Sequence, residues 1–161
     1  MVNISLEISA TLDQVEELYT NHPDYTFLLK VKCLNCGECT DKWHDVIESK
    51  GYPCKNGKTN VHFLAKCKLC GRENTLSILE GTNGIYHNQD QGKFKSIVTF
   101  ACRGIEPFEF TPTIGWIVKV ADSGTIYKDV NLTENEWVDY DDTISKCVGI
   151  YDFKSQFVKV K

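Results

Sequence analysis

The sequence predicts an all-β fold of the sandwich or barrel kind, with at most one or two short helices. Several short segments alternate apolar and polar residues, which is the period of a half-buried strand. Turns rich in glycine, asparagine and proline separate these segments at close intervals, as in β-sandwiches and barrels. No βαβ pattern, in which strands alternate with longer helical segments, is visible along the 161 residues.

The first expected strand covers residues 2–9, where every second residue is apolar. A short helix is expected over residues 11–19. Thr11 and Gln14 have the spacing of a capping box, and the apolar residues that follow recur at helical intervals. The Asn-His-Pro-Asp stretch at 21–24 should end this helix, because it combines residues that favour turns.

Later strands are expected wherever the alternation of apolar and polar residues returns. These segments are residues 25–33, 61–67, 76–78, 94–102, 116–120 and 148–160. The stretch 80–93 is rich in glycine and asparagine, so it is expected to be a mobile loop or a boundary between two lobes.

Length and composition indicate one ordinary globular chain. The 161 residues suit a single domain, or two small lobes that share a core. Hydrophobic residues make up 42% and charged residues 25% of the chain. No apolar run is long enough to span a bilayer, and the first residues lack the basic and apolar regions of a signal peptide. We therefore expect a cytoplasmic or nuclear protein with reduced thiols and no membrane association.

Eight cysteines include two Cys-x-x-Cys-Gly motifs: Cys33 and Cys36 in KCLNCG, and Cys67 and Cys70 in KCKLCG. Such a turn directs two sulfurs to one point, and the glycine permits a left-handed backbone whose amides face sulfur. Two facing turns supply the four thiolates that a structural zinc ion prefers. Residues 37–66 separate the pairs, a wide gap that is acceptable if this segment forms its own hairpin or loop. We predict one zinc ion per chain on these four cysteines.

Other uses of a Cys-x-x-Cys pair fit less well. A thioredoxin-like redox pair lies at the start of a helix, which lowers the thiol pKa, whereas both pairs here follow expected strands. Disulfides are disfavoured in a reducing compartment. The remaining alternative is two unrelated surface turns with free thiols, and the second copy of the motif argues against it.

The remaining candidate residues carry weaker signals. Cys39 and Cys54 lie near the motifs and could substitute as ligands, but they lack the spacing; His44 and His62 flank the motifs. Residues 134–142 are acidic with two aromatic residues, which indicates a solvated loop or, alternatively, a docking patch for a basic partner. No HExxH, GxSxG or P-loop motif occurs, and four filled ligand positions leave no place for a reactive water. We expect no enzymatic activity.

The two motifs also suggest an internal duplication. Both follow alternating apolar residues, in FLLKVKCLNCG and VHFLAKCKLCG, and weaker echoes surround Cys102 and Cys147. We predict two similar lobes: about 1–82, with the zinc site, and about 83–161, without a metal. The alternative is a coincidence between strands that happen to contain cysteine.

Five segments of the chain together resemble the eukaryotic CXXC-motif-containing zinc-binding protein family, and the resemblance covers almost the whole chain. They are KCLNCGE, KCKLCGREN, FACRGIEPFEF, DSGTIYKDVNLTENEWVDYD and VGIYDFKSQFVK. The resemblance implies an all-β, duplicated protein with one zinc ion held by Cys33, Cys36, Cys67 and Cys70. It assigns no ligand role to Cys39, Cys54, Cys102 or Cys147. Residues 44–64 show no family signature, and no settled enzymatic activity comes with the family.

We therefore expect a non-enzymatic, monomeric interaction module with a structural zinc ion, whose partner is another protein. The alternative is a metal-handling role, passing zinc or copper to a partner, because thiolate sites also suit Cu(I). Nucleic-acid binding is not expected, because the net charge of −4 and the lack of a basic cluster give little attraction for phosphates.

Overall fold

The computed structural model describes residues 2–53 and 60–160, and this part of the chain forms strands, loops and a single 3-10 turn without an α-helix. The prediction of an all-β fold is confirmed. The strands are β1 (Val2–Asp13), β2 (Val15–Thr20), β3 (Thr26–Cys33), β4 (His44–Ile47), β5 (Tyr52–Pro53), β6 (Asn60–Val61), β7 (Phe63–Lys66), β8 (Glu73–Ile78), β9 (Tyr86–His87), β10 (Lys95–Arg103), β11 (Ile105–Thr111), β12 (Ile114–Val120), β13 (Ile126–Asn131), β14 (Trp137–Asp141) and β15 (Lys146–Val160). The 3-10 turn is η1 (Asn88–Asp90).

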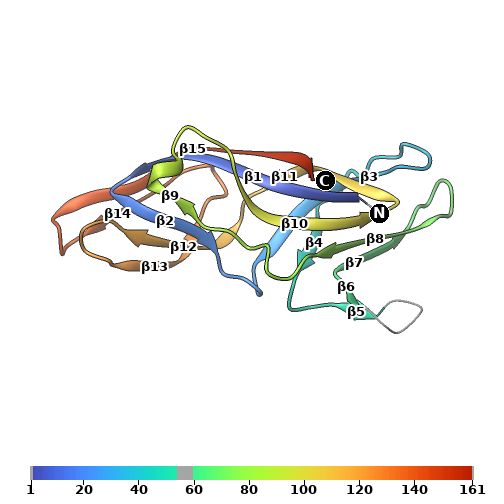
Figure 1. Cartoon of the computed structure of the whole chain (residues 1–161), viewed down its shortest axis with the longest axis horizontal. Coiled ribbons are helices and arrows are strands. Elements are labelled where there is room, and N and C mark those ends of the chain that lie inside the picture. Colours follow the sequence, from blue (N-terminus) through green and yellow to red (C-terminus); the bar gives the residue numbers. More distant parts are fainter. Residues whose placement is uncertain (1, 54–59, 161) are drawn as a thin grey trace.

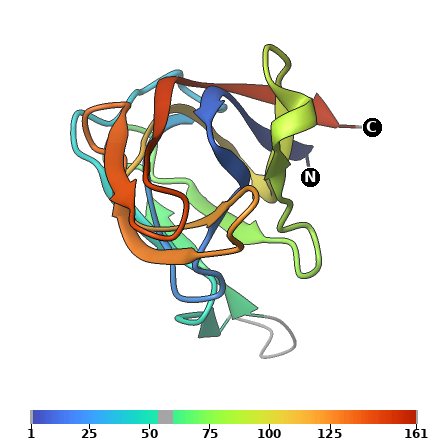
Figure 2. The ribbon, with the colours of Figure 1, turned by 90° about the vertical axis from the view of Figure 1, so that its left-hand side faces the viewer.

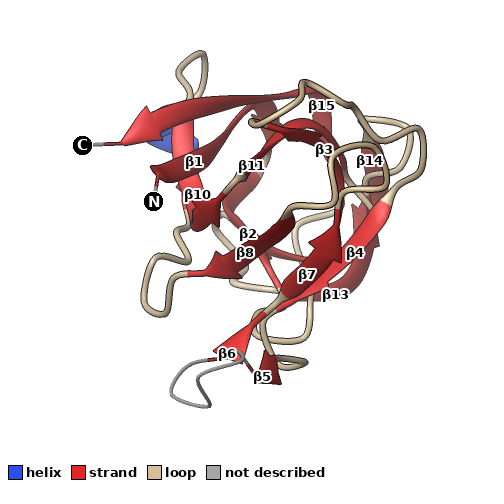
Figure 3. Ribbon diagram, turned by 90° about the vertical axis from the view of Figure 1, so that its right-hand side faces the viewer, coloured by secondary structure: helices blue, strands red, loops and turns tan. Residues whose placement is uncertain are grey.

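The strands form four antiparallel sheets. The largest has the order β14-β15-β1-β10-β8-β7, and the others are β11-β3-β4, β13-β12-β2-β9 and the small pair β5-β6. The sheets curl around the long axis of an elongated molecule (Figures 1 and 2). Seen from the end that carries β3, β7 and β8, they surround a common interior (Figure 3).

One hydrophobic core joins the sheets. On β1, Leu6 and Ile8 are fully buried, as the alternation in the sequence predicts. Aromatic rings link strands of different sheets: Phe27 of β3 meets Phe100 of β10 edge to face, with ring centroids 5.6 Å apart. Tyr25 meets Trp116 in the same manner at 5.3 Å. Such pairs add about 0.5–1.5 kcal/mol beyond the burial of their area.

The predicted helix over 11–19 is wrong. β1 continues to Asp13, Gln14 turns the chain with a φ of 60°, and β2 follows. β2 pairs with β12 on one side and with β9 on the other, and Leu18 is fully buried between them. An isolated helix of this length is only marginally stable. Strand pairing forms the backbone hydrogen bonds and buries the same apolar residues, so it is favoured over the helix that the spacing predicts.

The other expected strands are present with altered ends. The stretch 80–93 contains β9 and η1, and Tyr86 anchors it: its buried hydroxyl has one proton to donate and lies 2.6 Å from the carbonyl oxygen of Asp90 and 2.8 Å from that of Lys93. Its mobility stays a prediction. The acidic stretch 134–142 is not a loop throughout, because its centre forms β14 at the edge of the large sheet.

The internal duplication is not confirmed and stays a prediction. β1 from the first half lies between β10 and β15 from the second half, so the two predicted lobes contribute to one sheet. Within the described residues, no helix is long and apolar enough to cross a membrane.

Candidate metal centre

The two Cys-x-x-Cys-Gly motifs form two turns of the same backbone geometry. The first begins at Cys33, where β3 ends; the second begins at Cys67, directly after β7. The amide of Cys33 donates to the carbonyl of Glu38, and the amide of Cys67 donates to that of Arg72, both at 2.8 Å. Figure 1 shows the loops after β3 and β7 at the same end of the molecule.

A left-handed glycine closes each turn. Gly37 has a φ of 81° and Gly71 a φ of 75°. Their amides donate to the carbonyls of Cys33 (2.9 Å) and Cys67 (2.8 Å), four residues earlier. Other L-residues adopt this backbone conformation only at a cost of about 1–2 kcal/mol, so the glycines explain how each turn folds sharply enough to bring its two sulfurs together.

The four sulfurs of the two turns converge. Cys33 Sγ lies 3.8 Å from Cys70 Sγ, and Cys36 Sγ lies 3.5 Å from Cys67 Sγ. All four sulfurs lie within 4.8 Å of one another. Sulfurs about 2.3 Å from a tetrahedral zinc ion lie about 3.8 Å apart, so the two measured pairs are close to the spacing that a zinc ion requires. The four cysteines that the sequence singles out are therefore the ones that the fold brings together.

The sulfurs differ in how readily they ionise. Hydrogen bonds from the backbone amide of Cys36, and then from Asn35 and the Asn74 side chain, lower the pKa of Cys33 to about 6. The side chain of Asn35 and the amide of Arg72 lower the pKa of Cys70. For Cys36, the amide of Glu38 lowers the pKa, but burial and the neighbouring cysteines outweigh it and raise the pKa to about 12. Successive negative charges repel one another, so full ionisation of the set calls for a bound cation.

The set of sulfurs is buried on one side only. Cys33 is buried, whereas Cys36 and Cys70 are exposed and Cys67 is half-buried. Lys32, Lys66, Lys68 and Arg72 surround the turns and are exposed. Four thiolates and one zinc dication carry a net charge of −2, and these cations offset it weakly from solvent.

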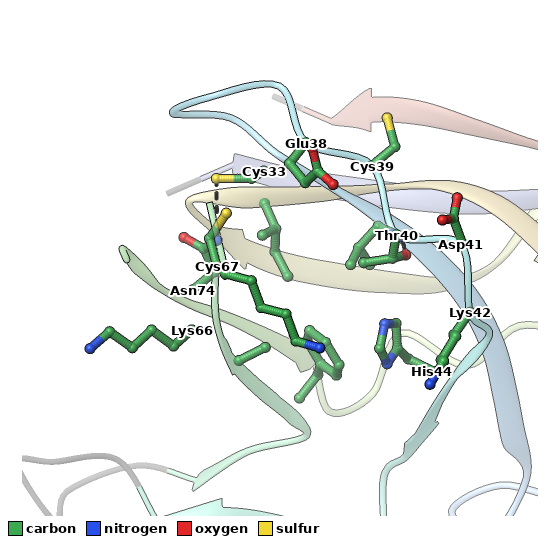
Figure 4. A pocket seen from close by; sticks show the side chains of 15 residues that line it. Cys33, Glu38, Cys39, Thr40, Asp41, Lys42, His44, Lys66, Cys67 and Asn74 are labelled. Carbon is green, nitrogen blue, oxygen red and sulfur yellow. Dashed lines mark hydrogen bonds between the residues drawn. The ribbon is translucent and has the colours of Figure 1, made fainter. Parts of the chain in front are cut away.

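A pocket of about 330 Å³ lies beside Cys33 and Cys67 (Figure 4). Phe63 and the aliphatic residues Val31, Ala65 and Ile105 line its apolar part. The His44 ring packs against Phe63 with centroids 4.9 Å apart, and burial lowers the pKa of His44. His44 is not part of the sulfur cluster, and its Nε2 is buried without a hydrogen-bond partner among the described residues.

The other sequence candidates that the structure describes lie outside the sulfur cluster. Cys39 is exposed and its thiol donates to the Gly37 carbonyl at 3.7 Å. His62 accepts a hydrogen bond from the amide of Ile78 at 2.8 Å, which is a structural contact. Cys102 is buried, and Cys147 is exposed. Cys54 lies outside the described residues.

Sequence reasoning missed Asn74, whose side chain reaches Cys33. The Nδ2–H group of Asn74 donates to Cys33 Sγ at 3.5 Å (Figure 4). The residue stands on β8, and neither its spacing nor its neighbours distinguish it from any other polar residue near a strand end. The contact becomes visible only in the tertiary structure, where β8 lies close to the first turn.

Comparisons with known proteins agree with this centre. A family model described as "CXXC motif containing zinc binding protein, eukaryotic" matches residues 5–158. A Drosophila melanogaster protein named "UPF0587 protein CG4646" is 48% identical over 100% of this chain and 99% of its own length. A Homo sapiens protein named "CXXC motif containing zinc binding protein" is 42% identical over 99% of both chains.

Solved structures show the same fold. The structure titled "Crystal Structure of C1orf123" superposes with a TM-score of 0.95 at 41% identity, covering 98% of this chain and 99% of the other. A "Hypothetical protein from plasmodium falciparum" superposes with a TM-score of 0.89 at 23% identity, covering 98% and 100% of the two chains, which shows likeness of fold alone. The near-complete family match, the full-length relatives and the four-cysteine cluster lead to one conclusion: this chain belongs to the eukaryotic family of CXXC-motif-containing zinc-binding proteins.

Proposed function

We propose that the chain binds one zinc ion through Cys33, Cys36, Cys67 and Cys70, and that this ion is structural. The observation that carries the proposal is the convergence of four sulfurs, from two turns far apart in sequence, to within 4.8 Å. The unfolded chain has no such site, so the binding free energy of zinc becomes free energy of folding.

The ligand set supports the proposal of a non-enzymatic role for the ion. Four protein sulfurs fill the tetrahedral coordination of zinc, whereas a catalytic zinc keeps one position open for water or substrate. The bound ion would therefore hold the ends of β3 and β7 together without activating a water molecule.

The function that this centre supports best is a protein-interaction module. The turns carry exposed aliphatic side chains next to the sulfurs: Leu34 is 46% exposed and Leu69 is 69% exposed. Zinc would fix the positions of these side chains and so present a rigid apolar surface to another protein. We propose a monomer in the cytoplasm or nucleus, whose partner is a protein and not a nucleic acid or a membrane.

The alternative, metal transfer, has its own supporting observation. Cys36 and Cys70 are exposed, so a thiolate of another protein could approach the ion from solvent. The rate of zinc transfer to a competing chelator separates the two roles. A structural ion should leave slowly, over hours, whereas a donor site should exchange within seconds to minutes.

The direct test is elemental analysis of the purified protein. We expect about one zinc ion per chain in the wild type. Two ions per chain would contradict the proposed single site. The interaction role is tested by affinity capture from cell extract with wild type and a Leu34→Ser/Leu69→Ser variant, each checked for full zinc content. Loss of a wild-type partner by a zinc-loaded variant supports the proposed surface; an unchanged set of partners counts against it.

A further inference from the structure

The buried amide of Asn74 joins the two halves of the sulfur cluster. Asn74 is 2% exposed and pairs with Ala65 of β7 in the large sheet, so its backbone belongs to the strands on either side of the second turn. Its side chain crosses to the first turn and donates to Cys33 Sγ at 3.5 Å. A single side chain thus links one sulfur turn to the backbone that supports the other.

Burying this amide is unfavourable, because one of its polar atoms has no hydrogen-bond partner in the described core. Asn74 Oδ1 is buried and has no hydrogen-bond partner among the described residues. An apolar side chain of similar shape would fill the same space without an unpaired carbonyl oxygen. The contact that distinguishes asparagine here is the hydrogen bond that it donates to sulfur.

The backbone beside the amide leaves room for it. Gly104 has a φ of 79°, and a Cβ atom built there would overlap the Asn74 carbonyl oxygen and lie 3.2 Å from its Cγ. The carbonyl of Gly104 accepts the amide of Leu34 at 2.9 Å, so this glycine also supports the first turn. Asn74, Gly104 and the first turn therefore form one packed unit behind Cys33.

Cys33 is the sulfur of the cluster that receives a hydrogen bond from a side chain outside both turns. It is buried, whereas water can reach Cys36 and Cys70 and donate hydrogen bonds to their thiolates. A metal-bound thiolate keeps much of its negative charge, and hydrogen bonds from outside the coordination sphere stabilise it and orient it. Asn74 gives Cys33 a hydrogen-bond donor in addition to the backbone amides of its own turn.

We propose that Asn74 is the positioning residue of the metal centre: its amide holds Cys33 Sγ in the orientation of a metal ligand and slows release of the metal. This inference rests on the proposed zinc site. It adds a residue that belongs to neither Cys-x-x-Cys motif, and it makes Cys33 the most firmly held ligand, while the exposed sulfurs exchange first.

The test compares zinc release from the full-length, zinc-loaded wild type, Asn74→Leu and Asn74→Asp into excess chelator. Loss of an outer hydrogen bond typically weakens metal affinity about 10–100-fold, so we expect release that is faster by a similar factor in both variants. Asn83→Leu is the matched control. Asn83 also has a buried Oδ1 without a partner among the described residues and an Nδ2 that donates to Glu48, and it lies outside the sulfur cluster.

Cobalt(II) substitution supplies a readout that a purely structural role would not change. The sulfur-to-cobalt charge-transfer band should shift in Asn74→Leu and stay at its wild-type position in Asn83→Leu. Wild-type release rates and spectra in a folded Asn74→Leu protein would overturn the inference, even if its melting temperature fell. If the leucine variant does not fold, zinc release and cobalt spectra are measured for Asn74→Ser instead. Wild-type values in this variant would overturn the inference, and faster release with a shifted band would support it. A wild type that binds no zinc on the four cysteines would instead overturn the proposed function.

Discussion

The cysteines of this chain differ in their surroundings, and these surroundings predict which cysteine substitutions abolish zinc binding. Cys67→Ser replaces a thiolate by a neutral hydroxyl and leaves three sulfurs at the site. We expect elemental analysis to find little zinc in this variant. Its melting temperature should fall by about 2–4 °C for each kcal/mol of folding free energy lost. Cys39→Ser is the control, because Cys39 is exposed and lies outside the cluster. A Cys67→Ser protein with full zinc content would refute the ligand set.

Asp141, which lies outside the sulfur cluster, offers a second prediction at the scale of one residue. Hydrogen bonds from the Ser123 hydroxyl (2.7 Å) and the Thr143 amide (2.8 Å) lower the pKa of Asp141. A carboxylate whose folded pKa is depressed contributes stability above its unfolded pKa, near 4, and this contribution is lost as pH falls through the folded pKa. Asp141→Asn should therefore lose less stability than wild type when the pH falls from about 5 to about 2.

Urea denaturation at several pH values measures this effect. Asp142→Asn is the control, since Asp142 is exposed at the neighbouring position. The prediction fails if Asp141→Asn and wild type show parallel curves of unfolding free energy against pH.

The two sulfur turns are the element whose shape depends most directly on sequence. Gly37→Ala and Gly71→Ala place a Cβ on a left-handed backbone, which costs about 1–2 kcal/mol and should spread the sulfurs. Space is not the obstacle: nothing lies within 4 Å of a Cβ at Gly37, and at Gly71 the nearest atom is Lys66 Cε at 3.8 Å. We expect weaker zinc binding in both variants, measured by competition with a chelator of known affinity.

Gly92→Ala is the matched control for these turns. Gly92 also has a φ of 81° and open space where a Cβ atom would lie, but it follows η1, away from the sulfurs. It should lose similar stability and keep wild-type zinc affinity. Equal losses of zinc affinity in all three glycine variants would show that general destabilisation, and not the turn geometry, controls the metal.

For the molecule as a whole, the sheet order predicts how the fold responds to loss of zinc. β1 lies between β10 and β15, so the central strands do not depend on the cysteine turns for their pairing. We expect removal of zinc by a chelator to raise hydrogen exchange at the two turns and at the adjoining ends of β3, β7 and β8. Amides of β1 and β10 should keep their protection. Uniform exchange along the chain would mean that zinc supports the entire fold.

The same sheet order predicts the behaviour of separated halves. A fragment of residues 1–82 contains β1 but lacks both of its partners, β10 and β15. We expect this fragment to be unfolded by circular dichroism, even with zinc, whereas the full chain is folded. A folded, zinc-binding fragment would support the two predicted lobes and their duplication.

The sequence by itself determined the features that depend on neighbouring residues. Alternation of apolar and polar residues predicted most strands, because a strand with one buried face needs that period wherever it lies in the fold. The spacing Cys-x-x-Cys-Gly likewise predicted the four sulfurs, because two cysteines of one turn and a left-handed glycine already determine half of a zinc site. The fold brings these sulfurs together as the motifs predict.

Tertiary structure alone decided the features that depend on residues far apart in the chain. Residues 11–19 have helical spacing, yet they form strands, since β12 and β9 offer paired edges to β2. Asn74 has no sequence signal, because its importance comes from a neighbour 41 residues away. Short-range sequence patterns indicate which secondary structures a segment can adopt and which metal ligands one turn can supply. Long-range pairing and burial choose among these options, because backbone hydrogen bonds and apolar contacts are satisfied only in the assembled core.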